Sequence, residues 1–139
     1  MKKLKQKIQW LKFIAAPCLL LLVLSSSCSK DKDNNPQGGN SYPKEVEVEY
    51  RLTSVRGITS GDVIYHNSTG GNTLVDKVTL PYSVKFKRTV NFTDNLAISI
   101  NALGSGEVKA EILVDGKVVT TQNYAGTSVL TGAAIYIFQ

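Results

Sequence analysis

The chain has only two cysteines and one histidine among its 139 residues. Cys18 lies within an apolar stretch near the N-terminus, and Cys28 follows the end of that stretch. If the segment before Cys28 is cleaved off, Cys28 is the only cysteine that remains, so no intramolecular disulfide can form. We therefore expect the stability of the folded part to come from its hydrophobic core.

The shortage of histidine also limits catalysis and metal binding. His66 lies in a predicted loop, and its candidate partners Asp62 and Asp76 fall in separate segments without the spacing of metal ligands. No nucleophile motif or second histidine base accompanies the serines and threonines. The sequence therefore predicts a protein that is not an enzyme and holds neither a metal nor a cofactor, with His66 as an exposed loop residue.

An excess of positive charge is also absent once the N-terminal segment is set aside. The chain has 16 Lys and Arg against 11 Asp and Glu, a formal net charge of +5. Five of the 16 cations precede Cys28, which leaves 11 cations against 11 anions and no net charge. Because phosphate backbones require a cationic surface, we expect no nucleic-acid partner.

The N-terminal segment is basic, then apolar, then small, and ends in a cysteine. Five lysines accompany Phe13–Leu24, an apolar run too short to span the ~30 Å hydrocarbon core of a membrane. The small residues Ser25, Ser26 and Ser27 come next. This order resembles that of bacterial lipoproteins, which implies a signal peptide over residues 1–27 and lipid attachment at Cys28 by diacylation. Leu24 lies four residues before the cysteine, one more than in the usual lipobox.

Residues 28–43 are predicted to be the lipidated cysteine and a flexible polar tether. In Ser29–Pro43 only Tyr42 is apolar, and fifteen such residues reach roughly 20 Å as a flexible coil. The charged run Lys30–Asp33 resembles the signal that sends some Bacteroidetes lipoproteins to the cell surface, and it also fits a solvated linker. We expect a protein of the cell envelope that is lipid-anchored in the outer membrane, either periplasmic or surface-exposed.

Residues 44–139 suffice for one domain and have the alternating pattern of β-strands. From Glu45 to Thr53, apolar residues alternate with polar ones, which is the period of a strand with one solvent-exposed face. Similar segments recur between turn-forming residues, at 63–65, 74–80, 82–87, 96–101, 108–114, 118–124 and 130–138. This spacing predicts an all-β, single-domain antiparallel β-sandwich of seven or eight strands.

Two local features and a core refine this prediction. Asp115-Gly116 is typical of a two-residue type I′ turn, so Ile112–Val114 should pair antiparallel with Lys117–Val119. Pro81 cannot donate to a strand ladder and should end a strand or lie at a sheet edge. The predicted core residues are Val48, Tyr50, Val78, Leu80, Val84, Phe86, Leu96, Ile98, Ile100, Val108, Ile112, Val114 and Ile135.

Charged stripes on the strands are candidate contact surfaces. One interpretation is that stripes of opposite sign lie on neighbouring strands, form cross-strand ion pairs and protect the sheet edges. The alternative is that one stripe contacts a partner protein. The acidic stripe is Glu45, Glu47 and Glu49, and the basic stripe is Lys85, Lys87 and Arg88. The same choice applies to Glu107, Lys109 and Glu111.

Loops and tyrosines are candidate ligand sites. The loop Gly57–Asp62 and Gly106 have the small, polar character of a binding loop on a rigid scaffold. Tyrosines can stack on sugars, although aromatic residues of sandwiches more often pack inside. The tyrosines concerned are Tyr42, Tyr65, Tyr82, Tyr124 and Tyr136.

Four segments of the chain resemble the MmpS family of mycobacterial transport accessory proteins. They are Glu49–Arg51, Val63–Asn67, Val78–Ser83 and Ile112–Val119, and their order and spacing cover most of residues 46–119. The resemblance implies a small immunoglobulin-like β-sandwich outside the cytoplasm that assists a transporter of the resistance-nodulation-division class. The chain departs from the family in its cleavable leader, in Tyr82 where the family tends to have Trp, and in its lack of late cysteines.

Together these patterns predict a lipid-anchored, non-catalytic binding module of the cell envelope. The leading hypothesis is an MmpS-like accessory to a membrane transporter or another envelope protein, with strand edges and charged faces as contact surfaces. The alternative is a surface lipoprotein that binds carbohydrate or another extracellular ligand.

Overall fold

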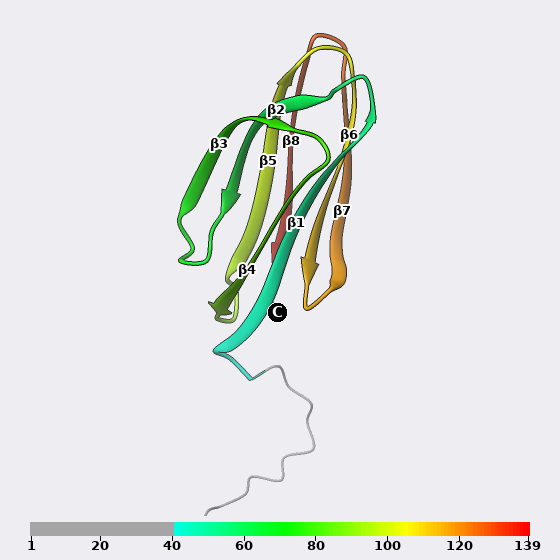
Figure 1. Ribbon diagram of the computed structural model, residues 1–139. Coiled ribbons are helices and arrows are strands. Elements are labelled where there is room, and N and C mark those ends of the chain that lie inside the picture. The colour runs from blue at the N-terminus through cyan, green and yellow to red at the C-terminus, as the bar shows by residue number, and fades with distance from the viewer. Residues whose placement is uncertain (1–40) are drawn as a thin grey trace, which may run out of the picture. The chain divides into compact units, whose positions relative to one another are not determined.

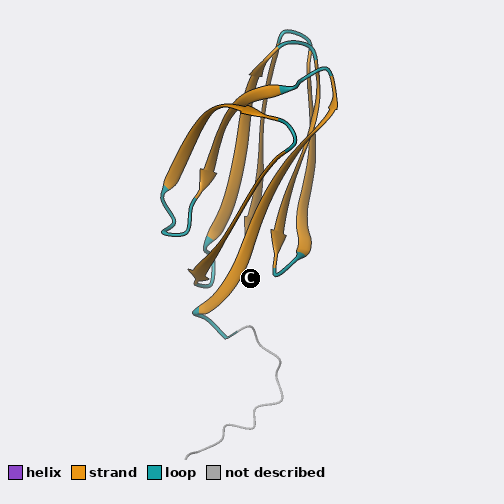
Figure 2. Cartoon of the chain, viewed as in Figure 1, coloured by secondary structure: helices purple, strands orange, loops and turns teal. Residues whose placement is uncertain are grey.

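The computed structural model describes residues 41–139, which form eight β-strands and no helix (Figures 1 and 2). Within this range, therefore, no helix is long and apolar enough to span a membrane. The predicted all-β class and the number of strands are confirmed. The strands are β1 (Lys44–Arg56), β2 (Ser60–His66), β3 (Asn72–Thr79), β4 (Tyr82–Val90), β5 (Asn95–Leu103), β6 (Gly106–Val114), β7 (Lys117–Gly126) and β8 (Val129–Ile137).

The strands form two four-stranded sheets, which pack face to face as the predicted β-sandwich. Sheet A has the order β4-β1-β6-β7 and sheet B the order β3-β2-β5-β8. All neighbouring strands are antiparallel. Only β2–β3 and β6–β7 are hairpins within one sheet, and every other connection crosses to the opposite sheet. These crossings interlock the sheets, as in immunoglobulin-like sandwiches.

The connections separate the sandwich into two ends, which we call proximal and distal. The proximal end holds Lys44, where β1 begins, and the turns β2–β3, β4–β5 and β6–β7 (Figure 1). The distal end holds Arg56, where β1 ends, and the turns β1–β2, β3–β4, β5–β6 and β7–β8. The chain enters the domain at the proximal end, where β1 begins, so the four distal turns lie at the opposite end of the domain.

The core lies between the two sheets and contains most of the predicted residues. Nine of the thirteen are buried: Val48, Tyr50, Val78, Leu80, Leu96, Ile98, Ile100, Val108 and Ile112. Val84, Phe86 and Val114 are half-buried and pack against this core. Ile135 was wrong, because its side chain is 54% exposed on the outer face of sheet B. In β8 the opposite parity is inside, and Leu130 and Ala134 are buried, together with Phe138 just beyond the strand.

The predicted β6–β7 hairpin is present, with one irregularity. Asp115 and Gly116 have φ values of 50° and 75°, as a type I′ turn requires. Val114 lies opposite Lys117 and Leu113 opposite Val118, but a bulge then places Ile112 opposite Thr120 instead of Val119. The hairpin prediction is therefore confirmed except for its register beyond the bulge.

Pro81 separates β3 from β4, which lie in different sheets. Both strands are at a sheet edge, where a missing backbone donor has little cost. The predicted break at Pro81 is therefore confirmed.

Packing begins two residues before β1. The Tyr42 ring lies edge-on to Phe92 and Phe138, with ring centroids 6.1 and 6.4 Å apart, and its hydroxyl donates to the backbone oxygen of Gln139. The Lys44 ammonium lies 4.9 Å from the centre of the Tyr42 ring, within reach of a cation–π interaction. The residue predicted as the single apolar member of the tether thus packs on the proximal end.

Candidate binding site at the distal end

Three distal turns meet backbone to backbone, and glycines make this possible. A Cβ on Gly57, whose φ is +75°, would lie 2.2 Å from the Ser105 carbonyl oxygen. A Cβ on Gly106 would lie 2.3 Å from the Arg56 carbonyl oxygen. Only glycine can occupy such positions without moving the neighbouring chain. The β1–β2 and β5–β6 turns are therefore fixed against each other, and the Gly104 amide bonds to the Ser128 oxygen at 2.8 Å, which adds the β7–β8 turn.

A groove of about 490 Å³ lies over these fixed turns. Its lining comes from the ends of β1 and β7 and from the starts of β6 and β8, with the intervening turns. The lining residues are Arg56, Gly57, Ser105, Gly106, Ala125, Gly126, Thr127 and Val129. Arg56 is the one ionisable residue among them, and its Nε lies 3.5 Å from the Glu107 carboxylate.

A second hollow, of about 300 Å³, opens at the distal end of sheet B. It is lined by Ser60, Gly61, Asp62, Lys77, Asn101, Ala102 and Leu103. The Asp62 carboxylate accepts a hydrogen bond of 2.9 Å from the Lys77 backbone amide and so fixes the bulge between β2 and β3.

Exposed apolar side chains border the two hollows. Leu103 is 85% exposed. It lies directly opposite Val129 in the β5–β8 pair, and Val129 is also exposed. Leu103 lines the second hollow and Val129 lines the groove, so this pair joins them. Apolar side chains next to an arginine are typical of protein–protein contact surfaces.

The predicted binding loop and Gly106 thus lie together at the distal end. Gly57 and Gly106 line the groove, and Ser60, Gly61 and Asp62 line the second hollow, whereas Ile58 between them is buried in the core. The contribution of the β7–β8 turn and the exposure of Leu103 were not predicted. Gly126 was a usable signal in the sequence, because a glycine between two apolar runs marks a turn. In the structure a Cβ there would lie 2.3 Å from the Val129 carbonyl oxygen.

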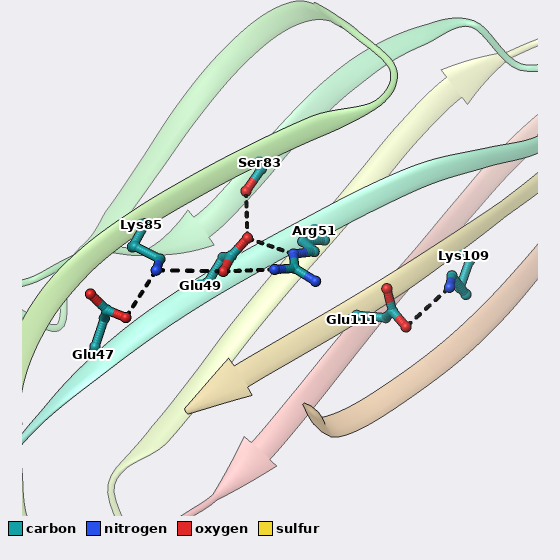
Figure 3. A network of polar contacts seen from close by, with 7 residues as sticks. All are labelled: Glu47, Glu49, Arg51, Ser83, Lys85, Lys109 and Glu111. Atoms are coloured by element: carbon teal, nitrogen blue, oxygen red, sulfur yellow. Dashed lines mark hydrogen bonds and ion pairs between the residues drawn. The ribbon is translucent and has the colours of Figure 1, made fainter. Parts of the chain in front are cut away.

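The acidic and basic stripes lie on neighbouring strands of sheet A and pair with each other. Glu47 and Glu49 stand opposite Lys87 and Lys85 in the β1–β4 ladder. The Lys85 ammonium lies 2.9 Å from the Glu47 carboxylate and 3.9 Å from that of Glu49 (Figure 3). Lys87 similarly reaches Glu45 at 3.0 Å. The cross-strand interpretation of the stripes is therefore confirmed for these residues.

Glu49 is the centre of this network. Its carboxylate accepts hydrogen bonds from the Arg51 guanidinium and, at 3.1 Å, from the Ser83 hydroxyl (Figure 3). The Arg51 hydrogen bond is the main reason why the pKa of Glu49 lies below its ordinary value. On β6, Lys109 pairs with Glu111 at 3.0 Å in the same manner. These charges satisfy one another on the outer face of sheet A.

Arg88 does not belong to the basic stripe. It lies opposite Val46, on the inward parity of β4, and its side chain is only 10% exposed. Its guanidinium donates to the Asn95 carbonyl oxygen at 3.0 Å and lies 3.9 Å from the Asp94 carboxylate. The prediction failed here because Lys87 and Arg88 are adjacent in sequence, and adjacent strand residues face opposite sides.

His66 and the tyrosines have structural surroundings. His66 is the last residue of β2 at the proximal end and is half-buried, so its prediction as an exposed loop residue was wrong. Asp62 lies near the start of that strand, at the distal end. The His66 carbonyl accepts a hydrogen bond from the buried Tyr50 hydroxyl at 3.1 Å. Within residues 41–139, no three His, Cys, Asp or Glu side chains form a group that would hold a metal ion. The five candidate tyrosines, at positions 42, 65, 82, 124 and 136, are half-buried and pack against the core.

The predicted lipid attachment at Cys28 and the signal peptide lie outside the described residues. Comparison of the sequence with known proteins gives no assignment of family: no protein-family model matches, and no curated protein matches. The resemblance to the MmpS family stays a prediction from the four segments that carry it.

Proposed function

We propose that this chain is a lipid-anchored, non-catalytic binding module of the cell envelope that serves as an accessory to a membrane transporter. In this proposal Cys28 carries the lipid, and the following tether joins the domain at its proximal end. The distal end is the contact surface. The observation that carries the proposal is the distal position of the fixed groove, the second hollow and the exposed Leu103–Val129 pair.

The lining of the two hollows favours a protein over a sugar as partner. Stacking on a sugar requires an exposed aromatic face, and neither hollow has an aromatic residue in its lining. The tyrosines that were candidates for stacking instead pack against the core. Arginine is enriched at protein interfaces, and Arg56 lines the groove together with the exposed Val129.

Photo-crosslinking in intact cells of the native host tests the proposed contact. A photoreactive amino acid would replace Leu103 at the distal end or, as the control, the exposed Thr89 near the proximal end of β4. We expect Leu103 to capture a transporter subunit, identified by mass spectrometry, and Thr89 not to capture it. Glycan-array binding by the purified chain, without any captured membrane protein, would replace this function with that of a carbohydrate-binding lipoprotein.

The lipid anchor has its own test. Replacement of Cys28 by Ala removes the thiol that would be acylated, so we expect unprocessed precursor and loss of label from a radioactive fatty acid. Cys18→Ala is the matched control and should be processed and labelled as the wild type is. Normal labelling of the Cys28→Ala chain would show that the anchor is elsewhere.

A further inference from the structure

The outer face of sheet B lacks the ion pairs that cover sheet A. We call the outward apolar side chains of Ile64, Leu74, Ala97, Ala133, Ile135 and Ile137 the neutral face, and Leu103 and Val129 continue it at the distal end. The four large ones are between 44% and 59% exposed. A cluster of this kind on a soluble surface marks an interaction site.

The neutral face is continuous across all four strands. Ile64 of β2 stands opposite Leu74 of β3 on one side and Ser99 of β5 on the other. Ser99 in turn stands opposite Ala133 of β8, and Ala97 stands opposite Ile135. Figure 1 shows these strands side by side in sheet B.

Charge is almost absent from this side of the molecule. β5 (NLAISINAL) and β8 (VLTGAAIYI) contain no charged residue. The charges of β2 and β3 are Asp62, Asp76 and Lys77, which lie toward the distal ends of those strands. A partner with a charged surface would therefore lose its hydration without gaining a counter-charge, whereas a second neutral face costs no such desolvation.

The shape and size of the neutral face fit a second sheet of the same kind. Antiparallel sheets pack face to face at a spacing of ~10 Å with their strands within about 30°. Four strands spaced ~4.8 Å apart, with up to nine residues rising ~3.3 Å each, present roughly 500 Å² per copy. Two copies together would bury on the order of 1,000 Å², which is the size at which a specific interface begins.

The free edge of sheet B at β8 is less available than its face. The Thr120 hydroxyl of β7 donates to the Ile135 carbonyl oxygen at 3.2 Å, so sheet A already covers part of that edge. Pairing of β8 with another chain through backbone hydrogen bonds would have to displace this contact. The face therefore offers the better route to association.

We propose that two copies of this chain associate through their neutral faces, as a symmetric dimer in which the B sheets stack against each other. A twofold arrangement uses the same surface on both copies and closes on itself. Leu103 and Val129 lie on the same outward side of β5 and β8 at the distal end, so they adjoin this interface. The dimer and the transporter contact can be told apart, because the dimer forms from the purified chain alone.

The oligomeric state of the purified full chain in detergent tests this proposal. Sedimentation velocity should show a dimer, and the pair of substitutions Ile64→Lys and Ile135→Lys should raise its dissociation constant at least about tenfold, because lysines would face each other across the interface. The matched control carries Thr89→Lys and Thr121→Lys on sheet A and should remain dimeric. A monomeric wild type at about 100 µM, or a dimer unchanged by the sheet B lysines, would refute the proposal.

A disulfide trap decides the case if the lysine variant does not fold. In a background with Cys18→Ser and Cys28→Ser, Ile64→Cys should give a covalent dimer on mild oxidation, because Ile64 lies near the centre of the neutral face. Thr121→Cys on sheet A is the control and should stay monomeric on a non-reducing gel. Equal crosslinking at both positions would indicate random collision and would overturn the proposed interface.

Discussion

The inner faces of sheets A and B are similarly apolar, whereas their outer faces differ in charge. Inside, both contribute fully buried aliphatic residues, such as Val48 and Ile112 from sheet A and Leu96 and Ile98 from sheet B. Outside, sheet A is covered by the ion pairs around Glu49, whereas sheet B exposes the neutral face. The inner faces alone are needed to hold the sandwich together, so the outer faces can differ in charge without a change of fold.

The largest expected effects come from the shared interior and test whether the inner faces are equivalent. Ile98→Ala in sheet B and Ile112→Ala in sheet A should each lower the free energy of unfolding by about 2–5 kcal/mol, because both side chains are completely buried. Ile135→Ala on the outer face should cost less than about 1 kcal/mol. Urea denaturation of the three variants measures this. At a protein concentration below the dissociation constant of the proposed dimer, an equal loss for Ile135→Ala would mean that the neutral face is covered within the folded monomer.

A second prediction concerns the contact between the two sheets at which the ring of Tyr124 packs on the backbone of Gly132. A Cβ on Gly132 of β8 would lie 2.1 Å from the ring of Tyr124 of β7. Gly132→Ala should therefore destabilise the domain by about 1–3 kcal/mol through overpacking, as measured by thermal unfolding. Gly71→Ala is the control, since its Cβ would have only ordinary contacts, the nearest at 3.7 Å. Adding Tyr124→Leu should reduce the cost of Gly132→Ala, and equal costs in both backgrounds would contradict this explanation.

The smallest expected effect concerns the charged outer face of sheet A. Because the folded state lowers the pKa of Glu49, its ion pair contributes stability above the ordinary pKa of the carboxyl, and this is lost as the pH falls through the lowered value. Glu49→Gln should cost less than about 1 kcal/mol at pH 7, since surface pairs contribute little. The difference from the wild type should vanish at strongly acidic pH. A pH-independent difference in urea midpoints would show that the amide perturbs packing rather than charge.

The buried side could be predicted for strands in which polar residues mark the other side, as in β1 and β5, but not for β8, in which both sides are mostly apolar. In β1 the glutamates mark the outward side, so Val48 and Tyr50 were assigned correctly to the core. In β8 the residues on both sides of the strand are mostly apolar, so the alternation does not show which side faces the core. Ile135 was placed inside for that reason. The same lack of charge that made the neutral face conspicuous in the structure hid it in the sequence.

The candidate site was only partly predictable because its members are distant in the chain. Turn composition identified Gly57 and Gly106 as parts of binding loops, because turn-forming residues can be recognised from the local sequence. That these turns meet the β7–β8 turn depends on the strand order of both sheets, which follows from tertiary pairing. Leu103 is exposed because it lies on the outward side of β5, whereas the adjacent Ala102 is buried. The alternation in β5 implies that side, but it does not show that Leu103 borders a hollow.

The separation of the turns between the two ends has a consequence for engineering. Each distal turn joins strands that are held in register by antiparallel ladders, so a turn can be exchanged for a sequence of another length without altering those ladders. Grafted turns would need to keep glycine at positions 57 and 106, where the backbones touch, and the buried Ile58 and Leu80, which belong to the core. Within that limit, the domain is a scaffold on which new specificities can be selected, much as variable loops are displayed on antibody frameworks.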